Sequence, residues 1–280
     1  MTTLNTNQTI LVVGANGKTG SRVVNLLTDK NIEVRKASRS SDTFFDWQQP
    51  SSWDAALTGV QAAYVTYFPD LALPSAPAHI QQFCELARQK GVEHITLLSG
   101  RGEEAAQICE DIVKQSGLSW NIVRCAWFNQ NFNEGLFKVA LDSGVLAFPV
   151  GFVKEPFVDV NDIADVVVAS LTEPGHQNKL YELTGPELLS FEDLAALFSQ
   201  ELGKTVSFQP VSVEQFSLSL QQMGVPDEVI QMLTYLFTQV LDGRNESLAD
   251  GVSQALNRPA RSFADYVQRN RDVFLEQGYD

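Results

Sequence analysis

Short apolar runs alternate with amphipathic segments through the first half of the chain. The apolar runs, each bounded by polar or turn residues, predict buried strands at residues 10–13, 32–37, 61–66, 95–99 and 120–125. The segments between them carry apolar side chains at helical spacing and predict helices at residues 21–30, 53–57, 80–90 and 103–116. Strict alternation of this kind is typical of an α/β fold, a doubly wound parallel sheet with helices on both faces and ligands at the carboxyl ends of its strands.

The second half of the chain alternates less strictly and is mainly helical. Helices are expected over residues 130–142, after Asn161, from the capping box at Ser190, after Pro226 and after Ser262. We therefore expect a cofactor-binding domain over residues 1–150 and a smaller, mainly helical substrate-binding portion over residues 151–280. The boundary is soft, because the strand-like run within residues 178–184 is a candidate for the main sheet.

A glycine-rich turn follows the first predicted strand. Gly14, Gly17 and Gly20 have the spacing G-x-x-G-x-x-G, between an apolar run and an amphipathic helix. Glycines here let a phosphate approach the backbone and let the helix pack tightly on its strand, and the helix N-terminus attracts a pyrophosphate. The turn predicts a Rossmann-type dinucleotide site, with candidate cofactor contacts at Gly14, Asn16, Gly17, Lys18, Thr19 and Gly20.

The end of the second strand bears on which dinucleotide is bound. NAD sites usually place an acidic residue there, but this chain has Ser38 and Arg39. A guanidinium can pair with the 2′-phosphate of NADP and stack on adenine, and the hydroxyl can donate to the same phosphate. NADP(H) is therefore preferred over NAD(H). The alternative, a solvated basic loop, is weakened by the glycine turn at the right distance upstream.

Composition narrows the class of protein further. With 44% hydrophobic and 19% charged residues the chain can bury a sizeable core, and a formal net charge of −14 argues against nucleic-acid or anionic-membrane partners. The three cysteines have no C-x-x-C pairing and are expected to be small buried hydrophobes, and the three histidines show no metal-ligand spacing. No signal peptide or membrane-spanning stretch is recognisable, so a cytoplasmic protein with a small-molecule substrate is expected.

Several segments resemble the NmrA-like family of atypical short-chain dehydrogenases/reductases. They are the glycine turn and the runs ASRS (37–40), FDW (45–47), SGLSWNIVR (116–124), WFNQNF (127–132), FVDVNDIA (157–164) and YELTGPE (181–187). Within that family the chain is most similar to the ergot-alkaloid (agroclavine) dehydrogenase type. The resemblance spans nearly the whole chain. It implies a Rossmann fold and either NADPH-linked reduction of imines or quinones, or regulation by bound NADP(H) without evident turnover.

The same resemblance implies roles for individual residues. Asp46 would approach the adenine edge, Thr66, Tyr67 and Phe68 would line the cofactor, and Ser99 would lie beside the nicotinamide. Phe148 and Pro149 would also lie near the nicotinamide, and the substrate pocket would be bordered by Trp127, Phe128, Asn131 and Phe132, together with Tyr67. For each aromatic side chain, packing in the core is an equally good interpretation.

The chain departs from typical short-chain dehydrogenases in its proton donor. None of its tyrosines is followed four residues later by lysine, so the usual Tyr-x-x-x-Lys pair is absent. At the corresponding place Glu110 and Lys114 have i,i+4 spacing, for which a surface ion pair is the preferred interpretation. A ketone product needs a donated proton, whereas an iminium needs none and a quinone can take protons from water.

Tyr67 and Ser99 are the remaining candidate catalytic hydroxyls. The sequence thus favours an NADPH-dependent reductase acting on a small, flat, electron-poor imine, iminium or quinone. The alternative is a redox-sensing regulator that binds NADP(H) and a protein partner.

Overall fold

The computed structural model describes residues 8–275 of the chain. Within these residues a seven-stranded sheet has the order β3-β2-β1-β4-β5-β6-β9, and every neighbouring pair is parallel. Its strands are β1 (Thr9–Val13), β2 (Glu33–Ser38), β3 (Thr43–Phe44), β4 (Ala62–Val65), β5 (His94–Gly100), β6 (Ser119–Cys125) and β9 (Lys179–Leu183). The expected Rossmann-type sheet is confirmed, and the run within residues 178–184 does join it beside β6.

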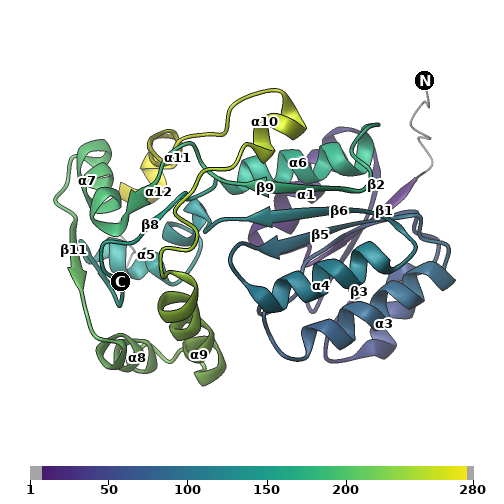
Figure 1. The fold of residues 1–280 in the computed structure, drawn as a ribbon, viewed down its shortest axis with the longest axis horizontal. Coiled ribbons are helices and arrows are strands. Elements are labelled where there is room, and N and C mark those ends of the chain that lie inside the picture. The colour runs from purple at the N-terminus through teal and green to yellow at the C-terminus, as the bar shows by residue number, and fades with distance from the viewer. Residues whose placement is uncertain (1–7, 276–280) are drawn as a thin grey trace. The chain divides into compact units, whose positions relative to one another are not determined.

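Helices cover both faces of this sheet (Figure 1). On one face α1 (Lys18–Asp29) packs against α6 (Val160–Thr172), and on the other α3 (Ala76–Gln89) packs against α4 (Glu104–Gln115). The short helices α2 (Trp53–Leu57) and α10 (Gly251–Leu256) complete the layers, and a 3-10 turn, Pro50–Ser52, precedes α2. Every residue of β1 and β4 is buried, and these two strands are apolar as expected for strands covered on both faces.

The contacts divide the chain into two compact units. The first comprises Met1–Cys125, Val160–Leu183 and Asp250–Pro259, and the second comprises Ala126–Asp159, Thr184–Ala249 and Ala260–Asp280. Residues 160–183 and 250–259 belong to the first unit because they pack against it. For example, Gly251 of α10 lies against the backbone of Glu182 in β9. Arg258 also forms ion pairs with Asp162 and Asp165 of α6, at 2.7 and 2.6 Å. The division therefore does not follow a single point near residue 150.

Helices dominate the second unit, as expected for the C-terminal portion. They are α5 (Phe137–Asp142), α7 (Phe191–Leu202), α8 (Val213–Gln222), α9 (Asp227–Tyr235), α11 (Phe263–Arg269) and α12 (Arg271–Leu275), with a 3-10 turn Asn129–Phe132 and a π-helical turn Leu236–Val240. Two small sheets pair β7 (Val145–Phe148) with β11 (Ser207–Pro210) and β8 (Lys154–Glu155) with β10 (Leu189–Ser190). The core of this unit is built largely from phenylalanine side chains.

Two local expectations need correction. Residues 130–142 are not one helix, since the 3-10 turn and α5 are separated at Gly135, and the side chains of Asn133 and Asn270 hydrogen-bond in the same region at 3.3 Å. Asn161 lies inside the first turn of α6 rather than preceding it, and its side chain accepts a hydrogen bond from Arg22 at 3.0 Å. The capping box expected at Ser190 is present, and the helix expected after Ser262 begins with a capping box as well.

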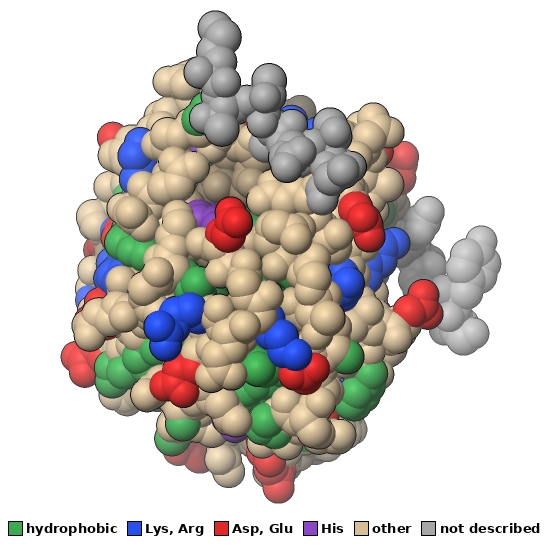
Figure 2. All heavy atoms as spheres, turned by 90° about the vertical axis from the view of Figure 1, so that its right-hand side faces the viewer, with side chains coloured by type: hydrophobic (Ala, Val, Ile, Leu, Met, Phe, Trp, Pro, Cys, Tyr) green, Lys and Arg blue, Asp and Glu red, His purple; other side chains and the backbone are tan. Residues whose placement is uncertain are grey.

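The surface carries charge of both signs. On the face in Figure 2 acidic and basic side chains are interspersed, with hydrophobic side chains scattered between them. Within residues 8–275, no helix is both long and apolar enough to cross a membrane. Cys84, Cys109 and Cys125 are free thiols and are buried, as expected.

Candidate dinucleotide and active site

The glycine turn after β1 is closely packed. Gly14 has a φ of +76°, and a Cβ there would lie 2.2 Å from Oγ1 of Thr66, at the end of β4. A Cβ on Gly20 would lie 2.1 Å from the carbonyl oxygen of Gly14. Gly17 precedes α1 without a side-chain cap, and the first helical bond runs from Ser21 N to Gly17 O at 3.0 Å. Such a turn and helix N-terminus fit the pyrophosphate of a dinucleotide.

Polar side chains of the β1 and β2 ends are joined beside this turn. Asn16 Nδ2 donates to the hydroxyl oxygens of Ser38 and Ser40 at 3.0 and 2.9 Å. Ser38 Oγ also lies 2.7 Å from Ser41 Oγ. This network fixes the β2–β3 loop next to the glycine turn, and so brings the predicted pyrophosphate and ribose contacts together.

Arg39 and Phe68 form an exposed pair at the ends of β2 and β4. The Arg39 guanidinium carbon lies 4.5 Å from the centroid of the Phe68 ring, and Phe68 is 58% exposed. A guanidinium and an aromatic face held at the ends of β2 and β4, the two strands that flank β1, can recognise a purine ring and an adjacent phosphate. Asp46, by contrast, is used in its own turn, where its Oδ1 accepts from Gln48 N at 3.0 Å.

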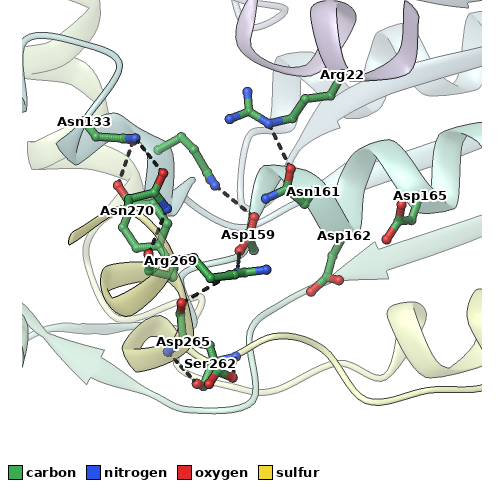
Figure 3. Close-up of polar contacts among 12 residues, drawn as sticks. Arg22, Asn133, Asp159, Asn161, Asp162, Asp165, Ser262, Asp265, Arg269 and Asn270 are labelled. Carbon is green, nitrogen blue, oxygen red and sulfur yellow. Dashed lines mark hydrogen bonds and ion pairs between the residues drawn. The ribbon is translucent and has the colours of Figure 1, made fainter. Parts of the chain in front are cut away.

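The first turn of α1 is held by internal contacts. Arg22 donates to the Lys18 carbonyl at 2.8 Å and to Asn161 at 3.0 Å (Figure 3). Thr19 is buried and faces Tyr64. The position of Arg22 thus has a reason within the protein, apart from any bound anion.

Tyr67 is buried in the core of the first unit, whereas the next residue, Phe68, is exposed. The Tyr67 ring lies 4.9 Å from Trp47, and its hydroxyl lies 2.8 Å from His79 Nδ1 and 3.1 Å from Ser75 Oγ. Burial raises the pKa of this hydroxyl. The candidate catalytic hydroxyl of Tyr67 is therefore engaged within the core, and it is not brought together with Ser99.

Ser99 belongs to a buried ionic network at the ends of β5 and β6. Its hydroxyl donates to Glu110 Oε1 at 2.7 Å, and Arg124 holds both oxygens of Glu110 at 2.8 and 2.5 Å. Glu110 is fully buried, and Lys114 Nζ lies 3.5 Å from it. The expected i,i+4 pair of Glu110 and Lys114 is present, but it is not a surface pair, because Glu110 is buried and its shorter contacts are with Arg124 of β6.

A second buried carboxyl lies at the same edge of the sheet. Glu103 is 8% exposed, and its Oε1 covers Gly100, the last residue of β5, where a Cβ would lie 2.1 Å away. Asp70, which affects the pKa of this carboxyl, belongs to the segment after β4. Burial first, and then Asp70, raise the pKa of Glu103 to about 9. Sequence reasoning missed this residue, because nothing in the local sequence marks Glu103 as buried.

The predicted substrate residues lie in the second unit. Trp127, Phe128 and Asn131 are half-buried, as is Pro149. Phe132 and Phe148 are fully buried among other phenylalanines, with Phe148 stacked on Phe237 at 5.4 Å. For these two rings the structure has the core packing that was the alternative interpretation.

The segment between these aromatic residues is fixed by polar groups. Gln130 donates to Asp159 Oδ1 at 2.8 Å. Arg269 forms an ion pair with the other oxygen of this fully buried carboxylate (Figure 3). Asn129 is fully buried as well, and within the described residues neither atom of its side-chain amide has a hydrogen-bond partner. Within residues 8–275, no group of three or more His, Cys, Asp or Glu side chains could hold a metal ion.

The fold and the glycine turn together define the class, a dinucleotide-binding α/β protein. Comparison with known families identifies the family within that class. Residues 104–264 match the NmrA-like family, and residues 14–174 match an NAD(P)H-binding family. The NAD(P)H azoreductase of Xenophilus azovorans is 30% identical over 290 residues, covering 95% of this chain and 99% of the relative. The chain therefore belongs to the NmrA-like family of NAD(P)H-dependent oxidoreductases.

Other relatives agree with this assignment. Agroclavine dehydrogenase of Claviceps fusiformis is 27% identical over 285 residues, covering 95% of this chain and 99% of that protein, which confirms the resemblance to the clavine type. Citrobacter sp. triphenylmethane reductase complexed with NADP(H) has a TM-score of 0.76 at 22% identity, covering 93% of this chain and 99% of that one. A quinone oxidoreductase from Escherichia coli complexed with NADPH has a TM-score of 0.75 at 22% identity, with the same coverage. These two likenesses establish the fold.

Proposed function

We propose that this protein is an NADPH-dependent reductase that delivers hydride to a small, flat, electron-poor acceptor of the iminium or quinone type. The observation that carries the proposal is the convergence of the glycine turn, the Asn16–Ser38 network and the Arg39–Phe68 pair at the carboxyl ends of β1, β2 and β4. When bound, the reduced nicotinamide supplies a hydride. The relatives named as an azoreductase and an agroclavine dehydrogenase support this class of reaction.

The chain's own residues would bind and orient the cofactor. Gly14 and Gly20 let the turn pack closely against Thr66 and against itself, and this turn would receive the pyrophosphate, to which the first turn of α1 would donate backbone N–H groups. Arg39 would pair with the 2′-phosphate while Phe68 and the guanidinium contact adenine, which is our basis for preferring NADP(H) over NAD(H). Ser99 would border the nicotinamide, held in one orientation by Glu110.

We choose the acceptor class from the absence of the usual proton donor. Without a Tyr-x-x-x-Lys pair, the protein has no standard donor for the alkoxide that forms when a ketone is reduced. An iminium is neutralised by the hydride itself, and a quinone is reduced readily because its product is aromatic. Half-buried Trp127 and Phe128 would provide flat contact surfaces for such acceptors.

A panel of acceptors tests the proposal. NADPH oxidation is followed with a cyclic iminium, a naphthoquinone, an azo dye and a simple ketone, beside calorimetric titrations of NADPH and NADH. We expect turnover with at least one of the first three, little with the ketone, and tighter binding of NADPH than of NADH. Tight NADPH binding with no oxidation by any acceptor would contradict a reductase and favour a regulator that senses the cofactor.

A further inference from the structure

Thr66, the residue after β4, contacts the start of the glycine turn. Its hydroxyl donates to the carbonyl oxygen of Val13, the last residue of β1, at 3.0 Å. The paired register of β1 and β4 extends to Val12 and Tyr64, so this bond joins the two segments beyond the end of their ladder. The acceptor belongs to the peptide group that leads into Gly14, where the turn begins.

Gly14 and Thr66 are fitted to each other. Gly14 has a φ of +76°, and a Cβ built on it would lie 2.2 Å from Thr66 Oγ1. The hydroxyl therefore occupies the place that a side chain at residue 14 would take. Glycine is needed here for this close approach as well as for its positive φ.

The next peptide group is the centre of the turn. The carbonyl oxygen of Gly14 accepts from Gly17 N at 2.9 Å, and a Cβ on Gly20 would lie 2.1 Å from it. α1 begins directly after Gly17. A bond that fixes the peptide group before Gly14 limits how the peptide group after it can rotate, and glycine has no side chain of its own to do so.

The Thr66 hydroxyl has no second proton to give to a bound anion. A threonine hydroxyl carries one proton, and the proton of Thr66 is donated to Val13. The pyrophosphate of a dinucleotide is ionised at neutral pH and offers acceptor oxygens, so it needs donors. An effect of this hydroxyl on cofactor binding therefore passes through the turn.

The main chain of Thr66 is held as well. Its carbonyl oxygen accepts from Nε1 of Trp47, a buried residue, at 3.0 Å. The next residue, Tyr67, packs on Trp47 with 4.9 Å between ring centroids, and the ring centroid of Phe68 lies 4.5 Å from the guanidinium carbon of Arg39. The end of β4 therefore has a fixed position from which the hydroxyl reaches β1.

We propose that Thr66 is a positioning residue of the cofactor site, whose hydroxyl holds the glycine turn in the conformation that receives the pyrophosphate. The inference rests on the proposed function and deepens it, because it adds a residue that acts through Gly14. Without the bond, the turn samples other conformations, and the apparent affinity falls with the fraction that is competent to bind. NADPH and NADH are affected together, since both carry the pyrophosphate.

Two substitutions of Thr66 that differ by a single oxygen test this role. Thr66→Ala removes the hydroxyl, and Thr66→Ser keeps it. In calorimetric titrations we expect Thr66→Ala to raise the Kd for NADPH and the Kd for NADH by a similar factor, about fivefold, as the loss of one hydrogen bond does. Thr66→Ser should keep both constants within about twofold of the wild type, because its hydroxyl can still donate to Val13.

Thr28→Ala is the matched control. Thr28 Oγ1 donates to the carbonyl oxygen of Val24 at 2.8 Å, so the substitution removes the same kind of bond near the other end of α1. Both dissociation constants should stay at their wild-type values.

Hydrogen exchange of the cofactor-free protein gives a readout that does not depend on binding. The Gly17 amide is bonded within the turn, so its exchange should be faster in Thr66→Ala, while the amides of β6 exchange as in the wild type. Thr66→Ser and Thr28→Ala should exchange like the wild type at Gly17.

Three results would overturn the inference. They are unchanged dissociation constants in Thr66→Ala, equal losses in Thr66→Ala and Thr66→Ser, and unchanged exchange at Gly17 in Thr66→Ala. A loss of affinity for NADPH alone would also overturn it, since the change would then lie at the 2′-phosphate. A wild-type protein that binds neither NADPH nor NADH contradicts the proposed function itself, and so is distinguished from these outcomes.

Discussion

Gly20 marks the closest approach of α1 to the end of β1. A methyl group at this residue would lie 2.1 Å from the Gly14 oxygen and 2.8 Å from the Gly14 carbon, which are backbone atoms with little freedom to move. We expect Gly20→Ala to lower the free energy of unfolding by about 2–3 kcal/mol. It should also weaken NADPH binding, because the turn that receives the pyrophosphate is displaced. Urea denaturation and calorimetric titration measure the two effects.

Gly151→Ala is the control for that substitution. Nothing lies within 4 Å of a Cβ built on Gly151, and its φ needs no glycine. The control should retain both stability and affinity. If Gly20→Ala behaved in the same way as Gly151→Ala, the close packing of α1 on the turn would not matter for binding.

Arg39 is the residue on which the proposed preference for NADP(H) depends. Arg39→Ala would remove the charge-assisted hydrogen bond that we propose to the 2′-phosphate, which only NADPH carries, and such bonds contribute about 1.5–3 kcal/mol. We therefore expect the Kd for NADPH to rise about 10- to 100-fold and the Kd for NADH to rise much less. Lys36→Ala, an exposed cation on the same strand, should change both constants only slightly. Equal weakening of the two cofactors by Arg39→Ala would refute contact with the 2′-phosphate.

The glycine turn and Arg39 could be found in the sequence because their signals are local. Glu110 and Glu103 could not. Glu110 of α4 is buried with Arg124, fourteen residues away on β6, and the carboxyl of Glu103 is buried against Gly100 at the end of β5. The i,i+4 spacing within α4 predicted Lys114 as the partner of Glu110. A single sequence reveals neighbours along a helix, but it does not reveal contacts between a helix and a strand that is distant in sequence.

His94 is a titratable residue that takes part in hydrogen bonds linking β5, β6 and α6. It begins β5, and its ring nitrogens lie 3.0 Å from Ser119 Oγ at the start of β6 and 3.1 Å from Thr96 Oγ1, which in turn contacts Ser170 of α6. Burial lowers the pKa of His94 to about 4. The neutral ring therefore belongs to the folded state, and protonation opposes this junction of β5, β6 and α6.

This shift predicts a pH dependence of stability. The unfolded chain takes up the His94 proton near pH 6.5, before the folded protein does, so the contribution is complete above that pH and is lost as the pH falls toward 4. Between pH 7 and 4 the wild type should lose about 2–3 kcal/mol more than His94→Gln, since the shift corresponds to roughly 3 kcal/mol. Chemical denaturation at several pH values measures both proteins. Parallel curves would mean that His94 is not the group responsible.

Elements with strong periodicity were predicted well, and those held by tertiary contacts were not. Strands β1, β4, β5 and β6 are apolar runs, and the capping box of α7 is visible as Ser190 and Asp193. Residues 130–142 have helical composition, yet Asn133 hydrogen-bonds to Asn270 and accepts from Tyr266 at 2.8 Å. Those partners lie more than 130 residues away, so no local pattern could reveal the break.

At the scale of the whole molecule, the two units are interleaved along the chain. The first unit takes segments from three parts of the sequence, and so does the second. The composition and alternation of the first half predicted the parallel sheet, but not the return of α6 and α10. α6 is almost entirely buried, and such a hydrophobic helix can be assigned to either unit from its sequence alone.

Because the two units alternate along the chain, we can predict how stable its N-terminal fragments are. A fragment of residues 1–150 lacks β9, which pairs with β6 from Asn121 to Cys125, and lacks α6, which covers α1. It would expose the edge of β6 and the buried face of α1, and we expect it to aggregate and to unfold without a cooperative transition. Size-exclusion chromatography and hydrogen exchange of β6 and α1 amides measure this.

A fragment of residues 1–183 is the matched comparison, because it restores both missing elements while still lacking most of the second unit. Its β6 and α1 amides should be protected more strongly than those of the shorter fragment, since β9 again accepts and donates along β6 and α6 again covers α1. If residues 1–150 alone gave a monomer with full protection of β6 and α1, then the later segments would be additions to an independent domain. We expect the opposite, because β9, which completes the sheet of the first unit, comes after residues 126–159 of the second unit in the sequence.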